Sequence, residues 1–235
     1  MSIQVFVEGG GDRRSHTACR KAFSALFDKL LGNRPKPRII ASGSGDQAYR
    51  DFCRSLADDA KNLPLLLVDS EGPVEIGKTA AAHLRERWTG ALPEGQVHLM
   101  VQCMEAWFFA DKTTLAAYYG DGFKESALPA NRRIEEIPKK DLLDALARAT
   151  KDTGKKRYHK TRHGFDILER LDPQLVRQCC PSPTHFSGFL CSLSTSSKLR
   201  ATIRSSGEGR LQHFLAPLPE AGRSGVFGRA RLGTV

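Results

Sequence analysis

The sequence predicts an α/β fold, built on a parallel sheet of about four strands with helices on both faces. Two observations predict it. Short apolar runs at residues 3–7 and 63–68 are typical of buried strands, and up to about residue 120 such runs alternate with helical patterns. Crossovers between parallel strands are right-handed, so the carboxyl ends of the strands meet at one edge. In open α/β sheets this edge is where ligands bind.

The first strand leads into an acidic, glycine-rich turn. Glu8 ends the apolar run, Gly9–Gly11 permit positive φ and a sharp turn, and Asp12 stands where a helix N-cap is expected. Apolar residues then recur at helical spacing over residues 15–31, and Gly32 ends the pattern. Taken alone, Asp12 is more simply a helix cap than a ligand.

The third strand ends in a second acidic turn. A short strand is predicted at residues 38–40 and a helix over residues 46–60. The apolar run 63–68 then closes on Asp69 and Glu71, whose side chains point the same way if the strand continues. Carboxylates at neighbouring strand ends repel each other, and sites of this kind hold hard divalent cations such as Mg²⁺.

A fourth strand is predicted at residues 96–102, after a helix over residues 76–87. It runs into Glu105, which therefore stands at another strand end and opens a helix. The aromatic run Trp107–Phe109 that follows is expected in the core rather than in a stacking platform.

The strand pattern stops after about residue 120, and only helices are expected beyond it. The predicted helices cover residues 139–150, 165–171 and, broken by prolines, 175–193. The chain is therefore divided into an α/β domain, a helical extension and a basic, disordered tail, at residues 1–125, 126–194 and 195–235.

Residues 151–164 are the most basic segment outside the tail. They form either a solvated loop, which is the usual fate of a charge run, or a phosphate-binding surface in which Tyr158 is interleaved with cations. The candidate nucleic-acid-binding residues are Lys155, Lys156, Arg157, Lys160 and Arg162.

The composition is that of a globular chain with an excess of positive charge. Hydrophobic residues make up 40% and charged residues 26%, which is ordinary for globular proteins. No apolar run is long enough to cross a membrane, and no signal peptide is evident, so a cytoplasmic protein is expected. The net charge of +10 favours a nucleic-acid partner without establishing one. The six cysteines show no metal-binding spacing, and the oligomeric state stays open.

Four stretches carry a resemblance to known families. Glu8-Gly-Gly-Gly-Asp12 and Asp69-Ser-Glu71 each close an apolar strand. They resemble the Toprim fold, which topoisomerases, primases and nucleases of the overcoming-lysogenization-defect class share. Met104-Glu-Ala-Trp107 and Tyr158-His-Lys160 narrow the resemblance. With them the chain is identified as a member of the DUF4276 family of Toprim-like proteins, over about residues 3–194.

The resemblance implies metal-dependent nuclease chemistry on DNA or RNA. Glu8 would be the general acid/base or a metal ligand, and Asp12, Asp69 and Glu71 would be ligands of Mg²⁺ or Mn²⁺. Glu105 is a ligand candidate at the level of the family only. Glu71 departs from the usual Asp-x-Asp motif, which makes a different metal geometry possible. The ion would neutralise the phosphate and lower the pKa of a bound water. An ATPase partner in antiphage defence is also implied.

Two other function classes stay open beside the nuclease. One is a non-catalytic nucleic-acid-binding or regulatory subunit whose acidic cluster holds a structural cation. The other is a small-molecule phosphohydrolase, against which the extended basic segment argues weakly. Strand passage is disfavoured because no motif positions a tyrosine as nucleophile.

Overall fold

The structure is a computed structural model that describes residues 2–58, 62–180 and 185–194. The predicted disordered tail, residues 195–235, lies outside the described residues.

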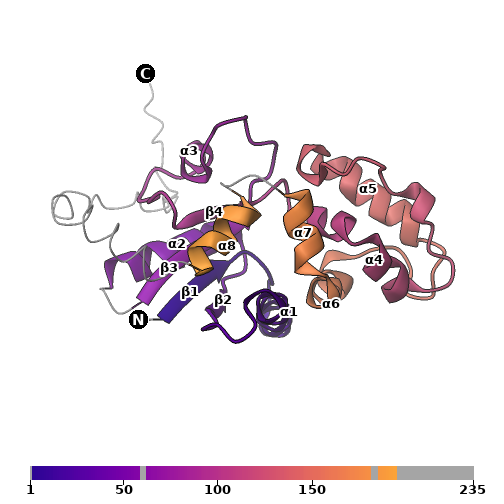
Figure 1. The fold of residues 1–235 in the computed structure, drawn as a ribbon, viewed down its shortest axis with the longest axis horizontal. Helices are drawn as coiled ribbons and strands as arrows, with labels where there is room; N and C mark the ends of the chain where they lie inside the picture. Colours follow the sequence, from indigo (N-terminus) through magenta and orange to yellow (C-terminus); the bar gives the residue numbers. More distant parts are fainter. Residues whose placement is uncertain (1, 59–61, 181–184, 195–235) are drawn as a thin grey trace, which may run out of the picture. The chain divides into compact units, whose positions relative to one another are not determined.

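Four parallel strands form one sheet in the order β2-β1-β3-β4 (Figure 1). The strands are β1 (Ser2–Val7), β2 (Arg38–Ala41), β3 (Asn62–Asp69) and β4 (Val97–Met100). Val7 lies opposite Leu67 in the register of β1 and β3, and Asp69 lies opposite Met100 in that of β3 and β4. The ends of β1, β3 and β4 therefore meet at one edge, and the predicted α/β fold is confirmed.

Helices cover both faces of the sheet because side chains alternate along each strand. On one face Phe6 and Leu66 pack with α2 (Gly45–Ala57) and α3 (Ala80–Leu84). On the other, α1 (Arg13–Leu31) and α8 (Phe186–Ser194) meet through Phe27 and Phe189, whose ring centroids are 5.2 Å apart. His98 of β4 also contacts Phe189, and burial lowers the pKa of this histidine to about 4.

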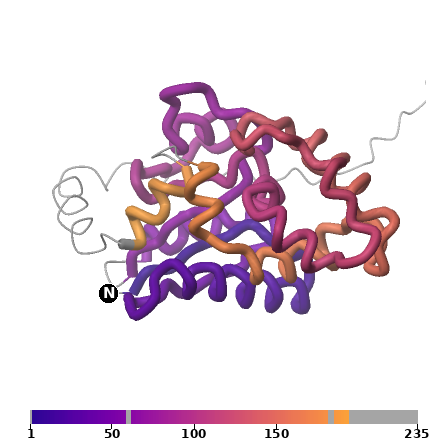
Figure 2. Tube along the Cα trace, turned by 45° about the vertical axis from the view of Figure 1, so that its right-hand side comes forward, coloured from indigo at the N-terminus to yellow at the C-terminus, as the bar shows by residue number. Residues whose placement is uncertain are grey.

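The remaining helices follow β4 and gather on one side of the sheet, as Figure 1 shows for α4 to α7. They are α4 (Lys112–Tyr119), α5 (Lys139–Thr150), α6 (Phe165–Arg170) and α7 (Pro173–Cys179). The same part of the chain holds the 3-10 helices η1 (Met104–Ala110), η2 (Glu125–Ala127) and η3 (Ile134–Glu136) and the π-helical segment η4 (Lys160–Gly164). The chain then returns along α8 to cover β4 (Figure 2).

Three predicted elements differ from the structure. The strand expected at residues 96–102 is limited to Val97–Met100. The helix expected over residues 76–87 is only the five-residue α3, because Gly77 takes a φ of +82° and Thr79 caps the helix at its start. The element that Glu105 opens is a 3-10 helix rather than an α-helix. Its aromatic residues, Trp107–Phe109, are buried in the core as predicted.

Candidate metal centre

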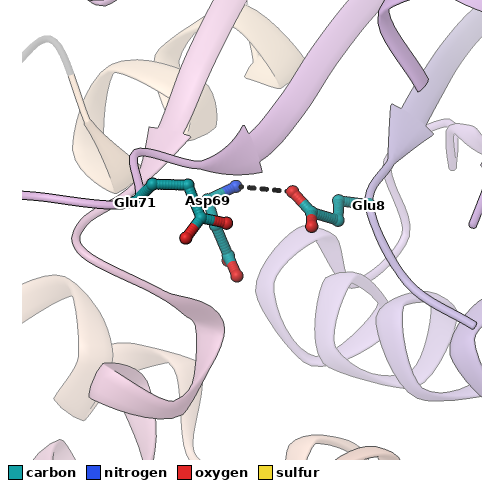
Figure 3. Close-up of side chains that lie close together, drawn as sticks. All are labelled: Glu8, Asp69 and Glu71. Carbon is teal, nitrogen blue, oxygen red and sulfur yellow. Dashed lines mark hydrogen bonds between the residues drawn. The ribbon is translucent and has the colours of Figure 1, made fainter. Parts of the chain in front are cut away.

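Three carboxylates converge at the carboxyl edge of the sheet. Glu8, Asp69 and Glu71 each offer an oxygen, and these oxygens lie within 4.8 Å of one another (Figure 3). Glu8 follows β1, Asp69 ends β3, and Glu71 lies in the turn after β3. The prediction that the acidic turns meet at one edge is confirmed for these residues.

The glycine turn after β1 fixes the place of Glu8. The Glu8 N–H donates to the Leu67 carbonyl at 3.3 Å, which continues the pairing with β3 for one residue. The side-chain Oε2 accepts a hydrogen bond from the Asp69 N–H at 3.4 Å. Gly10 has a φ of +83°, and a Cβ there would lie 2.6 Å from a carbon of the His16 ring. The turn therefore requires glycine, and it leaves the Glu8 carboxylate pointing at β3.

Glu71 reaches the centre in a way that strand alternation does not explain. The strand ends at Asp69 and does not continue, and Glu71 takes a φ of +65°. Its N–H donates to the Gln102 carbonyl at 3.0 Å, which holds the turn in place. The strand does not continue to Glu71, so the condition for sharing one strand face is not met, but both carboxylates still point to the same centre.

Asp69 is the most buried of the three, with 1% of its surface exposed. Its Oδ1 accepts a hydrogen bond from the Met104 N–H at 2.9 Å. Burial raises the pKa of Asp69 from its ordinary 3.8 to about 7. Lys160 opposes this rise, while Glu8 and Glu105 add to it. A carboxyl group at the centre of the cluster thus binds its proton far more tightly than an exposed aspartate does.

Glu8 is also shifted, and its surroundings explain why. Burial is the largest cause that raises its pKa, and the neighbouring Glu71 adds to it, while Lys160 opposes it. The Glu8 carboxylate also adjoins the first residue of α2, since a Cβ on Gly45 would lie 2.9 Å from Glu8 Oε2 and 3.2 Å from a nitrogen of Arg87. Only a residue without a side chain leaves room for both groups.

Two lysines from the helical part reach the carboxylates. Lys139 Nζ lies 2.6 Å from Glu71 Oε2 and 4.0 Å from Asp69 Oδ2. Lys160 Nζ lies 3.5 Å from Asp69 Oδ2 and 3.9 Å from Glu105 Oε1. Burial works against the charge of each lysine, but the carboxylates outweigh it and raise the pKa of both. Both lysines therefore stay charged and compensate part of the acidic charge.

Glu105 adjoins this group and is buried, with 1% of its surface exposed. Its Oε1 accepts a hydrogen bond from the Tyr158 hydroxyl at 2.9 Å. Burial, and then the charge of Glu105, raise the pKa of Tyr158, so the phenol remains a donor. The other carboxylate oxygen of Glu105, Oε2, is buried and makes no hydrogen bond within the described part of the chain. A buried carboxylate oxygen without a partner is costly, and a cation would satisfy it.

The donor set suits a hard divalent cation. All ligand atoms offered by Glu8, Asp69, Glu71 and Glu105 are carboxylate oxygens, which Mg²⁺ and Mn²⁺ prefer. When all four carboxylates are deprotonated, as metal binding requires, Lys139 and Lys160 compensate two of their four negative charges. The residues present therefore fit a divalent ion in both chemistry and charge.

Asp12 does not join the centre. Its side chain accepts a hydrogen bond from the Ser15 N–H at 2.8 Å and caps α1. This hydrogen bond lowers its pKa. The structure thus gives Asp12 the simpler of its two predicted roles, and the group of converging carboxylates within the described residues does not include it.

The basic segment divides into residues near the centre and residues away from it. Lys160 is an ion-pair partner of the cluster, and Arg157 lines a pocket beside it. Lys155 instead places its Nζ 5.1 Å from the centre of the Tyr118 ring. Lys156 and Arg162 are exposed. The segment folds back to the strand ends at Lys160 but not along its whole length.

Two functional candidates were missed from the sequence. Lys139 carried a signal: it opens α5, where a cation is unfavourable against the helix dipole, which suggests a distant acidic partner. Arg87 carried none, because its contacts with Asp46 of α2, at 3.1 and 2.8 Å, are purely tertiary.

Fold and site together define an α/β protein with a carboxylate centre at the carboxyl edge of a parallel sheet. The chain belongs to the family described as domain of unknown function (DUF4276), whose model matches residues 7–193. No curated protein and no solved structure matches the chain. None of the helices within the described ranges is both long and apolar enough to cross a membrane.

Proposed function

We propose that the protein is a nuclease that hydrolyses phosphodiester bonds of DNA or RNA with Mg²⁺ or Mn²⁺. The observation that carries the proposal is the convergence of Glu8, Asp69 and Glu71, with a Glu105 oxygen nearby that has no hydrogen-bond partner in the part of the chain that the structure describes. The acidic turns follow the ends of two neighbouring strands, β1 and β3, of one parallel sheet. This arrangement also supports the Toprim-like relationship that the sequence motifs suggest.

Each group at the centre has a task in this reaction. Asp69, Glu71 and Glu105 would hold the ion, which when bound neutralises charge on the phosphate and lowers the pKa of a water. Glu8, whose pKa is raised by burial, holds a proton more readily than an exposed glutamate and is therefore suited to accept or return one in the reaction. Lys160, with 47% of its side chain exposed, can turn from the carboxylates towards a substrate phosphate.

A cleavage assay on single- and double-stranded DNA and RNA, with Mg²⁺, Mn²⁺ or a chelator, tests the proposal. Glu8→Gln should abolish cleavage and leave binding intact or tighter, because it removes a negative charge facing phosphate. Asp12→Asn is the matched control from the same turn and should cleave like the unaltered protein, since Asp12 caps α1. Metal-independent cleavage, or full activity of Glu8→Gln, would contradict the proposal.

A second candidate is a non-catalytic nucleic-acid-binding or regulatory subunit with a structural cation. The ion pairs of Lys139 and Lys160 favour it, because they already compensate part of the acidic charge. Such a subunit would gain thermal stability from Mg²⁺ and bind nucleic acid without cleaving it.

The resemblance to nucleases of the overcoming-lysogenization-defect class supports an ATPase partner and antiphage defence as parts of the proposal. The cytoplasmic location expected from the sequence completes it. If the isolated protein is inactive, the assay is repeated with a candidate ATPase and ATP. Inactivity in both settings, with metal-dependent stabilisation, would favour the second candidate.

A further inference from the structure

A pocket of about 420 Å³ opens beside Glu105. One wall is the side of α5 and the other is the chain just before and within the start of η4. The lining residues are Lys139, Leu143, Asp144, Ala147, Arg157, Tyr158, His159, Lys160 and Glu105. Its volume lies within the range of ligand pockets, about 300–1,000 Å³. Because Glu105, Lys139 and Lys160 belong to both, the pocket adjoins the metal centre.

Hydrogen bonds at both ends of the pocket hold its walls in place. The Tyr158 N–H donates to Thr150 Oγ1, at the end of α5, at 2.7 Å. The Thr150 hydroxyl in turn donates to the Leu146 carbonyl at 2.7 Å. At the other end the Tyr158 hydroxyl donates to Glu105. The pocket is therefore formed before any ligand arrives, which lowers the cost of ordering it on binding.

The lining combines an apolar patch with excess positive charge. Leu143 and Ala147 lie one helical turn apart on α5 and both face the pocket. The charged residues of the lining are three cations (Lys139, Arg157 and Lys160) and two carboxylates (Asp144 and Glu105). Arg157 is exposed and, among the described residues, has no salt bridge within 4.0 Å, although its charge helps to lower the pKa of Asp144 in the same pocket after the larger effect of Lys140. An apolar wall beside an exposed guanidinium that is not held in a salt bridge suits a planar or sugar-like group that carries a phosphate.

We propose that this pocket holds a single nucleotide unit of the nucleic-acid substrate, next to the bond that is cleaved. The aliphatic groups of Leu143 and Ala147 receive the base or sugar, and Arg157 with Lys160 binds its phosphate. The role of the nucleotide as part of a cleaved substrate rests on the proposed function. Its binding in the pocket needs neither the metal nor cleavage. The nucleotide is thereby anchored beside Glu105, at the border of the metal centre.

Calorimetric titration of the full chain with adenosine and thymidine 5′-monophosphates, in the presence of a chelator, tests the proposal. Arg157→Glu should weaken mononucleotide binding about tenfold or more, the cost of one charge-assisted hydrogen bond. Arg148→Glu is the matched control, because Arg148 is exposed on α5, which forms one wall of the pocket, and is not itself a lining residue. Ala147→Trp, or Ala147→Leu if the larger side chain prevents folding, fills the pocket and should also weaken binding about tenfold.

The outcomes separate this inference from the nuclease proposal. Mononucleotide binding that is lost in Arg157→Glu and in the filled pocket supports the pocket even if no cleavage is found. Metal-dependent cleavage together with mononucleotide binding that neither variant alters overturns the pocket and leaves the nuclease standing. Inorganic phosphate that binds as tightly as a mononucleotide, with no effect of filling the pocket, also overturns it, because the site then takes a phosphate group alone.

Discussion

The buried carboxyl group of Asp69 makes the stability of the metal-free protein depend on pH. Its pKa rises from 3.8 when exposed to about 7 in the folded chain, with burial as the largest cause. A carboxyl group with a raised pKa favours the folded state while it is protonated. Its contribution is therefore complete below pH 3.8 and is lost as the pH rises through about 7.

The loss in the free energy of unfolding can be calculated from the shift in the pKa of Asp69. Between pH 5 and pH 8, the ionisation of Asp69 lowers the free energy of unfolding by about 3 kcal/mol. For a chain of this length that corresponds to a fall in Tm of about 6–12 °C. Asp69→Asn keeps an oxygen that can accept from the Met104 N–H and has no charge to bury. With a chelator present, the fall in Tm of Asp69→Asn between pH 5 and pH 8 should be about 6–12 °C smaller than that of the unaltered protein.

Thermal unfolding of both proteins at pH 5 and pH 8, with and without Mg²⁺, measures the effect. Mg²⁺ should raise the Tm of the unaltered protein more at pH 8 than at pH 5, because the ligands must be deprotonated. It should raise the Tm of Asp69→Asn much less. Parallel pH curves of the two proteins in chelator would refute the reasoning, since they would show that Asp69 ionises as an exposed aspartate does.

Three further substitutions test single contacts. Gly45→Ala places a Cβ 2.9 Å from Glu8 Oε2, so it should weaken Mg²⁺ binding about tenfold by calorimetry without removing a carboxylate. Tyr158→Phe removes the hydroxyl that donates to Glu105 and should lower the free energy of unfolding in urea by about 1–3 kcal/mol. Asp12→Ala removes the cap of α1 and should cost about 1 kcal/mol while leaving Mg²⁺ affinity unchanged.

Each of these has a control or an outcome that contradicts it. Gly72→Ala adds a methyl group in open space of the same site region and should leave Mg²⁺ affinity unaltered. Tyr118→Phe removes an exposed hydroxyl that lies 3.4 Å from Asp166 and should cost far less than Tyr158→Phe. A loss of Mg²⁺ affinity in Asp12→Ala would restore Asp12 as a ligand and contradict its role as a cap.

The sheet and the position of its acidic turns were predictable because they depend on local patterns. The run that became β3 is continuously apolar, the run that became β1 is interrupted only by Gln4, and a carboxylate stands at the end of each. Parallel pairing then brings Glu8 and Asp69 together whatever the details of the helices. The basic segment was less predictable, because a run of charges does not say which members turn inwards. Only Lys160 of that segment forms an ion pair with the cluster.

The rest of the site depends on contacts that no local pattern encodes. Glu71 enters through a positive φ on a residue that is not glycine, held by the Gln102 carbonyl from another strand end. Arg87 is placed by Asp46, 41 residues earlier in the chain. Such features become visible only when the tertiary packing is known, since their energy comes from long-range partners and not from the residues beside them.

The centre is assembled from both halves of the described chain, which has a consequence for its charge. Glu8 and Asp69 come from the sheet, whereas Lys139 and Lys160 come from the helical part that follows it. Without the lysines, the sheet edge would carry several carboxylates with little compensation, and burying Asp69 would cost more than it does now. Without the carboxylates, Lys139 at the start of α5 and Lys160 at the start of η4 would be partly buried cations that lack the acidic partners they have now. Each half therefore stabilises a charge arrangement that the other cannot keep alone. The boundary predicted near residue 125 thus separates two sequence patterns but does not separate the site.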